Sequence, residues 1–185
     1  IILTRPLIEI EDLMNVLFKQ GHNLIHLPTL KIKPVEISPI NFKNYDDVIF
    51  TSSNAVRNLK NKSKQESIKC FCVGSITEKI ARSSGFTNTI SASGNVIALK
   101  NIISNSKELG RNAKLVYIRG DNISFDLEND LSKEGFKVTK IINYSSEKIE
   151  FVSDHTLDLI KKYPINVTFV YSIRSAEALI NIINN

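Results

Sequence analysis

Apolar residues along the chain alternate between two spacings. Short apolar runs suit the strands of a buried sheet, and between them apolar residues recur with the periodicity of one helix face. Ile10, Leu13, Met14 and Leu17 show the helical spacing and are followed by Gly21, a residue typical of helix ends. The predicted strands are residues 1–4, 23–27, 48–50, 69–73, 115–118 and 137–144, and the predicted helices are 10–17, 76–84, 96–104 and one that bears Ile123, Leu127 and Leu131. This alternation predicts an α/β fold in which crossover helices join parallel strands.

The chain also contains an internal repeat. Arg5 and Gly21, which flank the first predicted helix, recur as Arg119 and Gly135, each 114 positions later. The segments FTSSNAVRNL and VYSIRSAEAL match at an offset of 120. We therefore predict one α/β unit used twice. The first copy continues into CVGSITEKIARSSGF whereas the second stops at Asn185, so we expect a C-terminal strand and helix of the first domain to be missing.

Small polar residues follow several of the predicted strands directly. The stretch VIFTSSNAV passes from an apolar run into Thr51, Ser52, Ser53 and Asn54. The other members of this set are Gly74, Ser75, Thr77, Ser172, Arg174 and Ser175, with Arg5, Arg119 and Gly120 after two further strands. Ligands of parallel α/β sheets bind outside the carboxyl ends of the strands, where helix N-termini offer free N–H groups. Helix capping explains any one of these turns by itself. Three such turns together with two arginines favour a site for anions, and above all for carboxylates.

Other kinds of site are disfavoured by the same turns. None has the G-x-x-x-x-G-K-[ST] or G-x-G-x-x-G spacing of a nucleotide-phosphate loop, and none has the G-x-S-x-G elbow of a serine hydrolase. Asp46 and Asp47 precede a predicted strand, so they belong to the edge opposite the candidate site. We interpret both as solvated turn residues.

The cysteines and histidines do not have the spacing of a metal site. Cys70 and Cys72 are two residues apart in a predicted strand, so both side chains point to one face, and metal-binding knuckles do not use this spacing. We interpret them as reduced core residues. His22 and His26 are expected on an extended segment rather than on one helical face, so no metal site is predicted.

Composition narrows the class of protein. With 185 residues, of which 42% are hydrophobic, the chain is long enough for a sizeable core. The net charge of +5 favours an anionic partner, but the charges are scattered and Trp is absent, which makes nucleic acid a poor candidate. No apolar run approaches the roughly 20 residues of a membrane helix, and no export signal is recognisable. We expect a cytoplasmic protein with no membrane partner.

Taken in order, several short segments resemble the uroporphyrinogen-III synthase family. They are LTRP, DDVIFTSSNAV, CVG-x-x-T, YIRG, the strand that ends in Tyr144, and YSIRSA. The resemblance covers essentially the whole chain. It implies two similar parallel-sheet α/β domains, one formed by residues 1–30 plus 148–185 and the other by 34–142. A two-stranded connector near 26–33 and 141–149 would join them, and the active site would lie in the cleft between the domains.

The resemblance also implies a reaction. Members of the family cyclise the linear tetrapyrrole hydroxymethylbilane with inversion of its last pyrrole ring and loss of water, without a metal or cofactor, in haem biosynthesis. Tyr144 matches the family's tyrosine and is expected to act as general acid, and Thr77 matches a second catalytic position. Ser52, Ser53 and Ser172 match positions that bind substrate. A monomer is expected.

Two alternatives stay open beside this interpretation. Without the family, Tyr144 would be explained as an aromatic residue packed against a domain edge. The chain also departs from the family at Val170, Tyr171 and Ser172, where the usual turn is F-T-S.

The second alternative concerns function: the chain would be a non-catalytic two-domain α/β module that binds a polycarboxylate small molecule.

Overall fold

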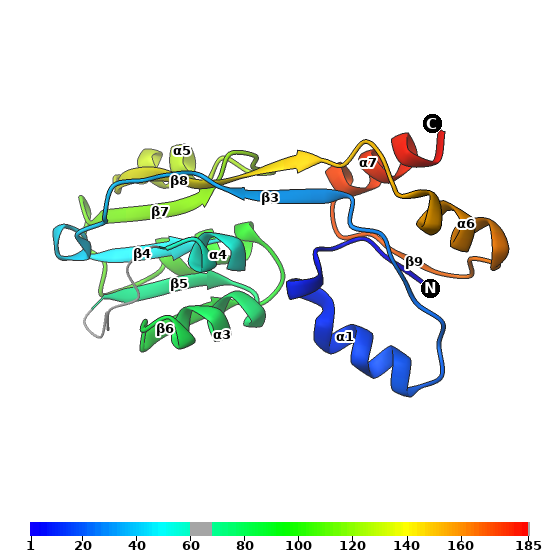
Figure 1. Cartoon of the computed structure of the whole chain (residues 1–185). Helices are drawn as coiled ribbons and strands as arrows, with labels where there is room; N and C mark the ends of the chain where they lie inside the picture. The colour runs from blue at the N-terminus through cyan, green and yellow to red at the C-terminus, as the bar shows by residue number, and fades with distance from the viewer. Residues whose placement is uncertain (60–67, 185) are drawn as a thin grey trace. The chain divides into compact units, whose positions relative to one another are not determined.

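The computed structural model describes residues 1–59 and 68–184 of the chain (Figure 1). The chain divides into two compact units, which are described separately. Unit 1 combines Ile1–Ile32 with Ser146–Asn185, and unit 2 is Lys33–Ser145. One continuous stretch thus forms unit 2, whereas unit 1 is assembled from both ends of the chain.

Unit 2 is built on a parallel sheet. Its strands are β4 (Asp47–Phe50), β5 (Lys69–Val73), β6 (Asn88–Ala92), β7 (Lys114–Gly120) and β8 (Lys137–Lys148). With β3 (Leu30–Pro34) they form a sheet of order β3-β8-β7-β4-β5-β6, in which β4 to β8 pair in parallel. The chain runs outward from β4 to β6 and then returns to the other side of β4 to add β7 and β8. The order therefore reverses between β4 and β7, and in doubly wound sheets ligands bind at this switch point.

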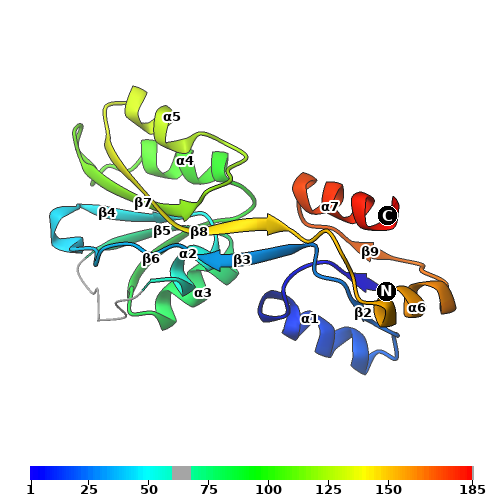
Figure 2. The same ribbon diagram turned by 45° about the horizontal axis from the view of Figure 1, so that its top comes forward.

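Helices cover both faces of this sheet. Figure 2 shows α4 (Val96–Ser104) and α5 (Leu127–Lys133) on one side, and α2 (Ser53–Arg57) and α3 (Ser75–Ser83) on the other. Because side chains alternate along a strand, each strand feeds both cores. The α2–α3 core includes Val48, Phe50, Val56, Cys70, Cys72, Ala81, Phe86 and Ile118, and Phe42 of the 3-10 helix η1 (Phe42–Asn44) packs edge-on against Phe86. The α4–α5 core includes Ile49, Phe71, Leu99, Ile103, Leu115, Tyr117, Leu127 and Leu131.

Unit 1 contains a smaller parallel sheet. Its strands β1 (Ile2–Leu3), β2 (Ile25–His26) and β9 (Thr168–Phe169) lie in the order β2-β1-β9. The helices are α1 (Leu7–Lys19), α6 (Asp154–Lys162) and α7 (Ile173–Asn184). The core brings together Ile2, Ile25, Leu27 and Leu179.

Strands β3 and β8 both cross the boundary between the units. The amide of Val35 donates to the carbonyl of Asn143 (3.0 Å), and the amide of Ile149 donates to the carbonyl of Thr29 (2.9 Å). Going from Thr29 to Val35 in the chain, the partner residue changes from Ile149 to Asn143. The two strands therefore run antiparallel.

Most of the predicted elements are present, and the mixed α/β class is confirmed. The predicted helix bearing Ile123 is wrong at its start, because α5 begins at Leu127 and Ile123 is exposed. Strand β6 and helix α6 were not predicted. The cysteines are free and buried, as expected, with their sulfur atoms 3.6 Å apart.

Asp47 corrects a second prediction. It was interpreted as a solvated turn residue, but it is the first residue of β4 and only 6% exposed. Burial of its carboxyl group raises the pKa from 3.8 to about 6, against a smaller opposing effect of Lys69. Asp46 does lie in the turn, where its Oδ2 accepts a hydrogen bond from the amide of Lys114 (2.7 Å).

Candidate functional site

The turn after β4 lies at the switch point of the unit 2 sheet. The Ser52 hydroxyl caps α2 by accepting a hydrogen bond from the Asn54 amide (3.2 Å). Ser53 accepts a hydrogen bond from Nη1 of Arg57 (2.8 Å) and is buried, as is Asn54. Thr51 and Ser52 are half-buried. Of the four residues predicted here, these two therefore offer the more accessible hydroxyl groups.

The turn after β5 leads directly into α3. Gly74 has a φ of 78° and a ψ of 150°, a region that is essentially restricted to glycine, and α3 begins directly after it. Ser75 is exposed in the first turn of α3, whereas Thr77 is 5% exposed. Ser75 thus lies beside the free N–H groups of a two-turn helix, which favour an anion.

Arg119, at the end of β7, is buried rather than directed to solvent. Its Nη1 donates to the carbonyl oxygens of Gly120 (2.6 Å) and Asp121 (3.2 Å). The residue is 7% exposed, and its Nε has no hydrogen-bond partner within the described ranges. The sequence prediction treated Arg119 as a substrate ligand equivalent to Arg5, but its guanidinium group stabilises the turn after β7.

Tyr144 lies on β8 beside the end of β7. Its carbonyl accepts a hydrogen bond from the Asp121 amide (3.0 Å), and its half-buried ring packs against the α2–α3 core. The preceding residue, Asn143, is completely buried, and its Nδ2 donates to the carbonyl of Ala55 in α2 (2.7 Å). Sequence reasoning missed Asn143. The only signal was an amide side chain directly after Ile141 and Ile142.

The predicted residues of unit 1 divide between the surface and the core. The guanidinium group of Arg5 lies 4.2 Å from the ring centre of Tyr171, and its Nε lies 3.5 Å from Oε2 of Glu9. Ser172 is exposed, and its hydroxyl accepts a hydrogen bond from the Ser175 amide (3.1 Å) at the start of α7.

Arg174 and Ser175 make internal contacts. Arg174 donates to the hydroxyl (2.8 Å) and carbonyl (2.6 Å) of Ser146. The buried Ser175 hydroxyl lies 2.6 Å from that of Thr29 and 3.3 Å from that of Thr4. These bonds give Ser175 a structural role in joining α7 to the segments after β1 and β2.

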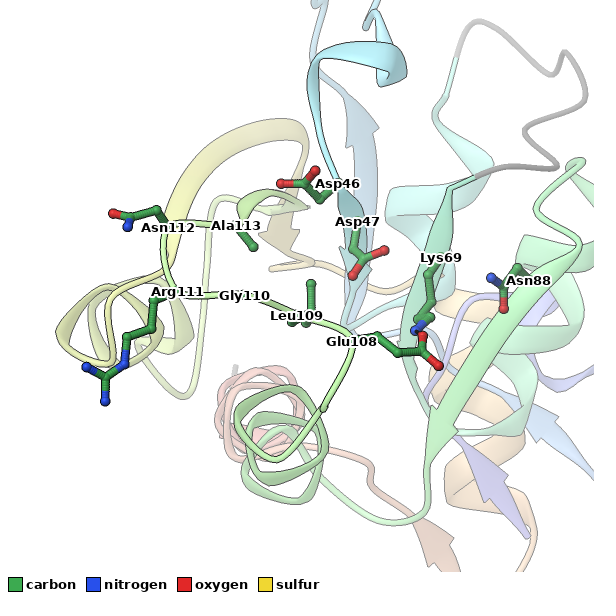
Figure 3. A pocket seen from close by; sticks show the side chains of 10 residues that line it. All are labelled: Asp46, Asp47, Lys69, Asn88, Glu108, Leu109, Gly110, Arg111, Asn112 and Ala113. Atoms are coloured by element: carbon green, nitrogen blue, oxygen red, sulfur yellow. Dashed lines mark hydrogen bonds and ion pairs between the residues drawn. The ribbon is translucent and has the colours of Figure 1, made fainter.

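A polar pocket lies at the opposite edge of the unit 2 sheet. Figure 3 shows Asp46, Asp47, Lys69, Glu108 and Arg111 among the residues that line it, and Lys69 forms an ion pair with Glu108. These residues belong to the beginnings of β4 and β5 and to the segment before β7. Because α/β sheets bind ligands at the carboxyl ends of their strands, the pocket is not the predicted site.

The described residues contain neither a cluster of metal ligands nor a membrane-spanning helix. Within 1–59 and 68–184, no group of three or more His, Cys, Asp or Glu side chains could hold a metal ion. No helix in the same ranges is long and apolar enough to cross a membrane.

A known protein family matches almost the whole chain. The profile of the family described as uroporphyrinogen-III synthase HemD matches residues 11–185. The chain belongs to the uroporphyrinogen-III synthase family. This match confirms the resemblance found in the sequence, and members of the uroporphyrinogen-III synthase family are enzymes of tetrapyrrole biosynthesis. No curated protein matches the chain in a direct sequence comparison.

Solved structures of uroporphyrinogen-III synthases share the fold. The enzyme from Helicobacter pylori has a TM-score of 0.58 and 16% sequence identity, over 84% of this chain and 70% of that chain. A mutant enzyme from the extremely thermophilic bacterium Thermus thermophilus has a TM-score of 0.50 and 13% identity, over 80% of this chain and 63% of that chain. At these identities the likeness concerns the α/β fold alone.

Proposed function

We propose that the protein cyclises hydroxymethylbilane to uroporphyrinogen III, with inversion of the terminal pyrrole ring and loss of water. The observation that carries this proposal is the family match across residues 11–185. The turns after β4 and β5 support it, because they contain small hydroxyl residues and the turn after β4 lies at the switch point of the sheet.

Tyr144 is the proposed general acid. Its phenol gives a proton to the terminal hydroxyl group of the substrate, and the C–O bond breaks with its electron pair as water leaves. The substituted carbon of the terminal pyrrole then attacks the cationic methylene carbon and forms a spiro intermediate. Reopening and closure of this intermediate, with loss of a proton, give the inverted ring. Thr77 is proposed to assist at the leaving hydroxyl group.

Binding of the substrate requires groups that recognise several carboxylates. Hydroxymethylbilane carries eight of them, and each is suited to hydroxyl groups, helix N-termini or arginine. We assign Ser52 and Ser75 in unit 2, and Arg5 and Ser172 in unit 1, as the accessible candidates. Positioning does most of the catalytic work, because the unassisted reaction closes the ring without inversion.

The direct test is to incubate the purified protein with hydroxymethylbilane and to separate the macrocycles formed. The proposal predicts that the type III isomer exceeds the type I isomer that forms spontaneously. Type I product alone would contradict it. Saturable substrate binding together with type I product alone would favour the non-catalytic polycarboxylate-binding module instead.

A further inference from the structure

Gly120 lies unusually close to the ring of Tyr144. A Cβ atom built on Gly120 would lie 2.5 Å from Cζ, 2.6 Å from Cε2 and 2.9 Å from the phenol oxygen of Tyr144. Gly120 is not one of the glycines with positive φ, so its backbone would accept another residue. The close approach of the ring, and not the backbone conformation, is therefore what requires a glycine at this position.

A β-bulge in β8 aims Tyr144 at Gly120. Arg119 pairs with Ile142, but the next residue, Gly120, pairs with Tyr144, so Asn143 is the extra residue of the bulge. A bulge interrupts the alternation of side chains and redirects the residue that follows. Ile141 packs against the α2–α3 core, and Tyr144, three positions later, packs against the same core instead of the opposite face.

The bulge is held on two sides. The side chain of Asn143 donates to the Ala55 carbonyl of α2 at 2.7 Å, and its own carbonyl accepts from the amide of Val35 at 3.0 Å. Both contacts belong to unit 2. The direction of the Tyr144 ring is thus fixed by the fold of one unit, and the missing side chain of Gly120 leaves the space that the ring occupies.

We propose that Gly120 is a positioning residue for Tyr144. The Tyr144 ring rests on the last residue of β7, and this contact sets the place of the phenol oxygen at the carboxyl edge of the sheet. The assignment rests on the proposed function, in which Tyr144 is the acid. It replaces the sequence prediction that Gly120 binds substrate directly.

A double-mutant cycle tests the contact without any activity measurement. Gly120→Ala, Tyr144→Ala and the double variant are compared by the midpoint of denaturant unfolding, with Gly110→Ala as control because a Cβ on Gly110 meets nothing within 4 Å. We expect Gly120→Ala to lower the midpoint in the wild-type background and to have no such effect once the Tyr144 ring is removed. An equal effect in both backgrounds, or none in the wild-type background, overturns the proposal. If Gly120→Ala does not fold, recovery of folding in the double variant supports the contact, and failure of both variants overturns it.

Kinetics with hydroxymethylbilane then separate positioning from substrate binding. A displaced acid lowers turnover while substrate affinity is kept, so Gly120→Ala should lower kcat by roughly tenfold to a hundredfold with KM within about twofold. A higher KM with unchanged kcat would mean that Gly120 contacts the substrate, and would overturn the proposal. If the wild-type protein forms only the type I isomer, the proposed function fails, while the unfolding cycle still decides the contact.

Discussion

Tyr117 of β7 and Tyr144 of β8 have different surroundings. Tyr117 is 2% exposed, and its phenol oxygen lies 3.0 Å from the Thr51 hydroxyl. Burial raises the pKa of its phenol, against smaller opposing effects of Thr51 and Arg119. Tyr144 is half-buried and pairs with Gly120, the last residue of β7. Of the two, Tyr144 is therefore better suited to the proposed transfer of a proton to the substrate.

Replacing Tyr144 by phenylalanine isolates this role. Tyr144→Phe keeps the ring on Gly120 but removes the acidic proton, so kcat should fall by roughly 10²- to 10⁴-fold while KM changes little. Steady-state kinetics with hydroxymethylbilane measure both constants. Tyr117→Phe is the matched control, which should keep its turnover and lose only about 0.5–1.5 kcal/mol of stability with the Thr51 hydrogen bond. Equal turnover of Tyr144→Phe and wild type would remove Tyr144 from its role.

The buried carboxyl group of Asp47 predicts a pH-dependent stability. Its pKa in the folded protein is about 6, against an ordinary value of 3.8, so the charged form is disfavoured by folding. The cost is absent below pH 3.8, grows between 3.8 and 6, and is complete above 6. Asp47→Asn should therefore raise the free energy of unfolding at about pH 7.5 by about 1–3 kcal/mol and give little gain near about pH 4.

Urea unfolding at several pH values checks this expectation. Asp12→Asn, on the exposed surface of α1, serves as the control substitution. A gain from Asp47→Asn that is the same at every pH would show that relief of a buried charge is not its cause.

At the scale of elements, sequence patterns predicted the central strands best. The runs in β4, β5 and β7 are apolar on both faces because helices cover both sides of the sheet, and this pattern is visible without neighbours. Strand β6 was missed because its sequence, NTISA, is mostly polar, which an edge strand tolerates. Helix α5 starts later than predicted because Asp126 caps it, its Oδ1 accepting from the Asn129 amide (3.2 Å).

The bulge at Asn143 could not be predicted from spacing. Its existence depends on the register with β7 and on a hydrogen bond to Ala55, which is 88 positions away in the sequence. The candidate turns, by contrast, were located by local chemistry, since hydroxyl residues directly after an apolar run are a short-range signal. The sequence therefore predicted which edge of the sheet carries the candidate turns, but not the β-bulge that orients Tyr144.

Loss of the Asn143 side chain should weaken this element. Asn143→Ala removes the donor to the buried Ala55 carbonyl, so the free energy of unfolding should fall by about 1–3 kcal/mol. Denaturant unfolding measures it, with Asn122→Ala in the exposed turn after β7 as control. If both variants unfold at the same midpoint, the bond does not hold the bulge.

At the scale of the whole molecule, the repeat predicted more likeness than the structure contains. Arg5 and Arg119 occupy matching positions in the sequence, yet Arg5 stacks on Tyr171 whereas Arg119 is buried among carbonyl groups of its own turn. Side-chain environments depend on the neighbouring strands, and the sheets of the two units differ in size. A repeat thus predicts the path of the chain but not the burial and contacts of each equivalent side chain.

The net charge of +5 leads to a prediction about salt. Attraction between a basic protein and a substrate with eight carboxylates weakens as ions screen it, over a distance of about 10 Å at 0.1 M salt. KM for hydroxymethylbilane should therefore rise several-fold between roughly 50 and 500 mM NaCl, with kcat little changed. Unfolding midpoints over the same range separate this effect from loss of the fold. A constant KM would mean that general charge attraction contributes nothing to binding.

The two free thiols inside the α2–α3 core can report on local opening of the folded protein. Cys70 and Cys72 are completely buried on a central strand, and the pKa of the Cys70 thiol is raised by its hydrogen bond with Cys72 and by burial. A thiol reagent can reach them only when this part of the sheet opens. The rate at which such a reagent modifies the native protein will therefore time these openings without any engineered label.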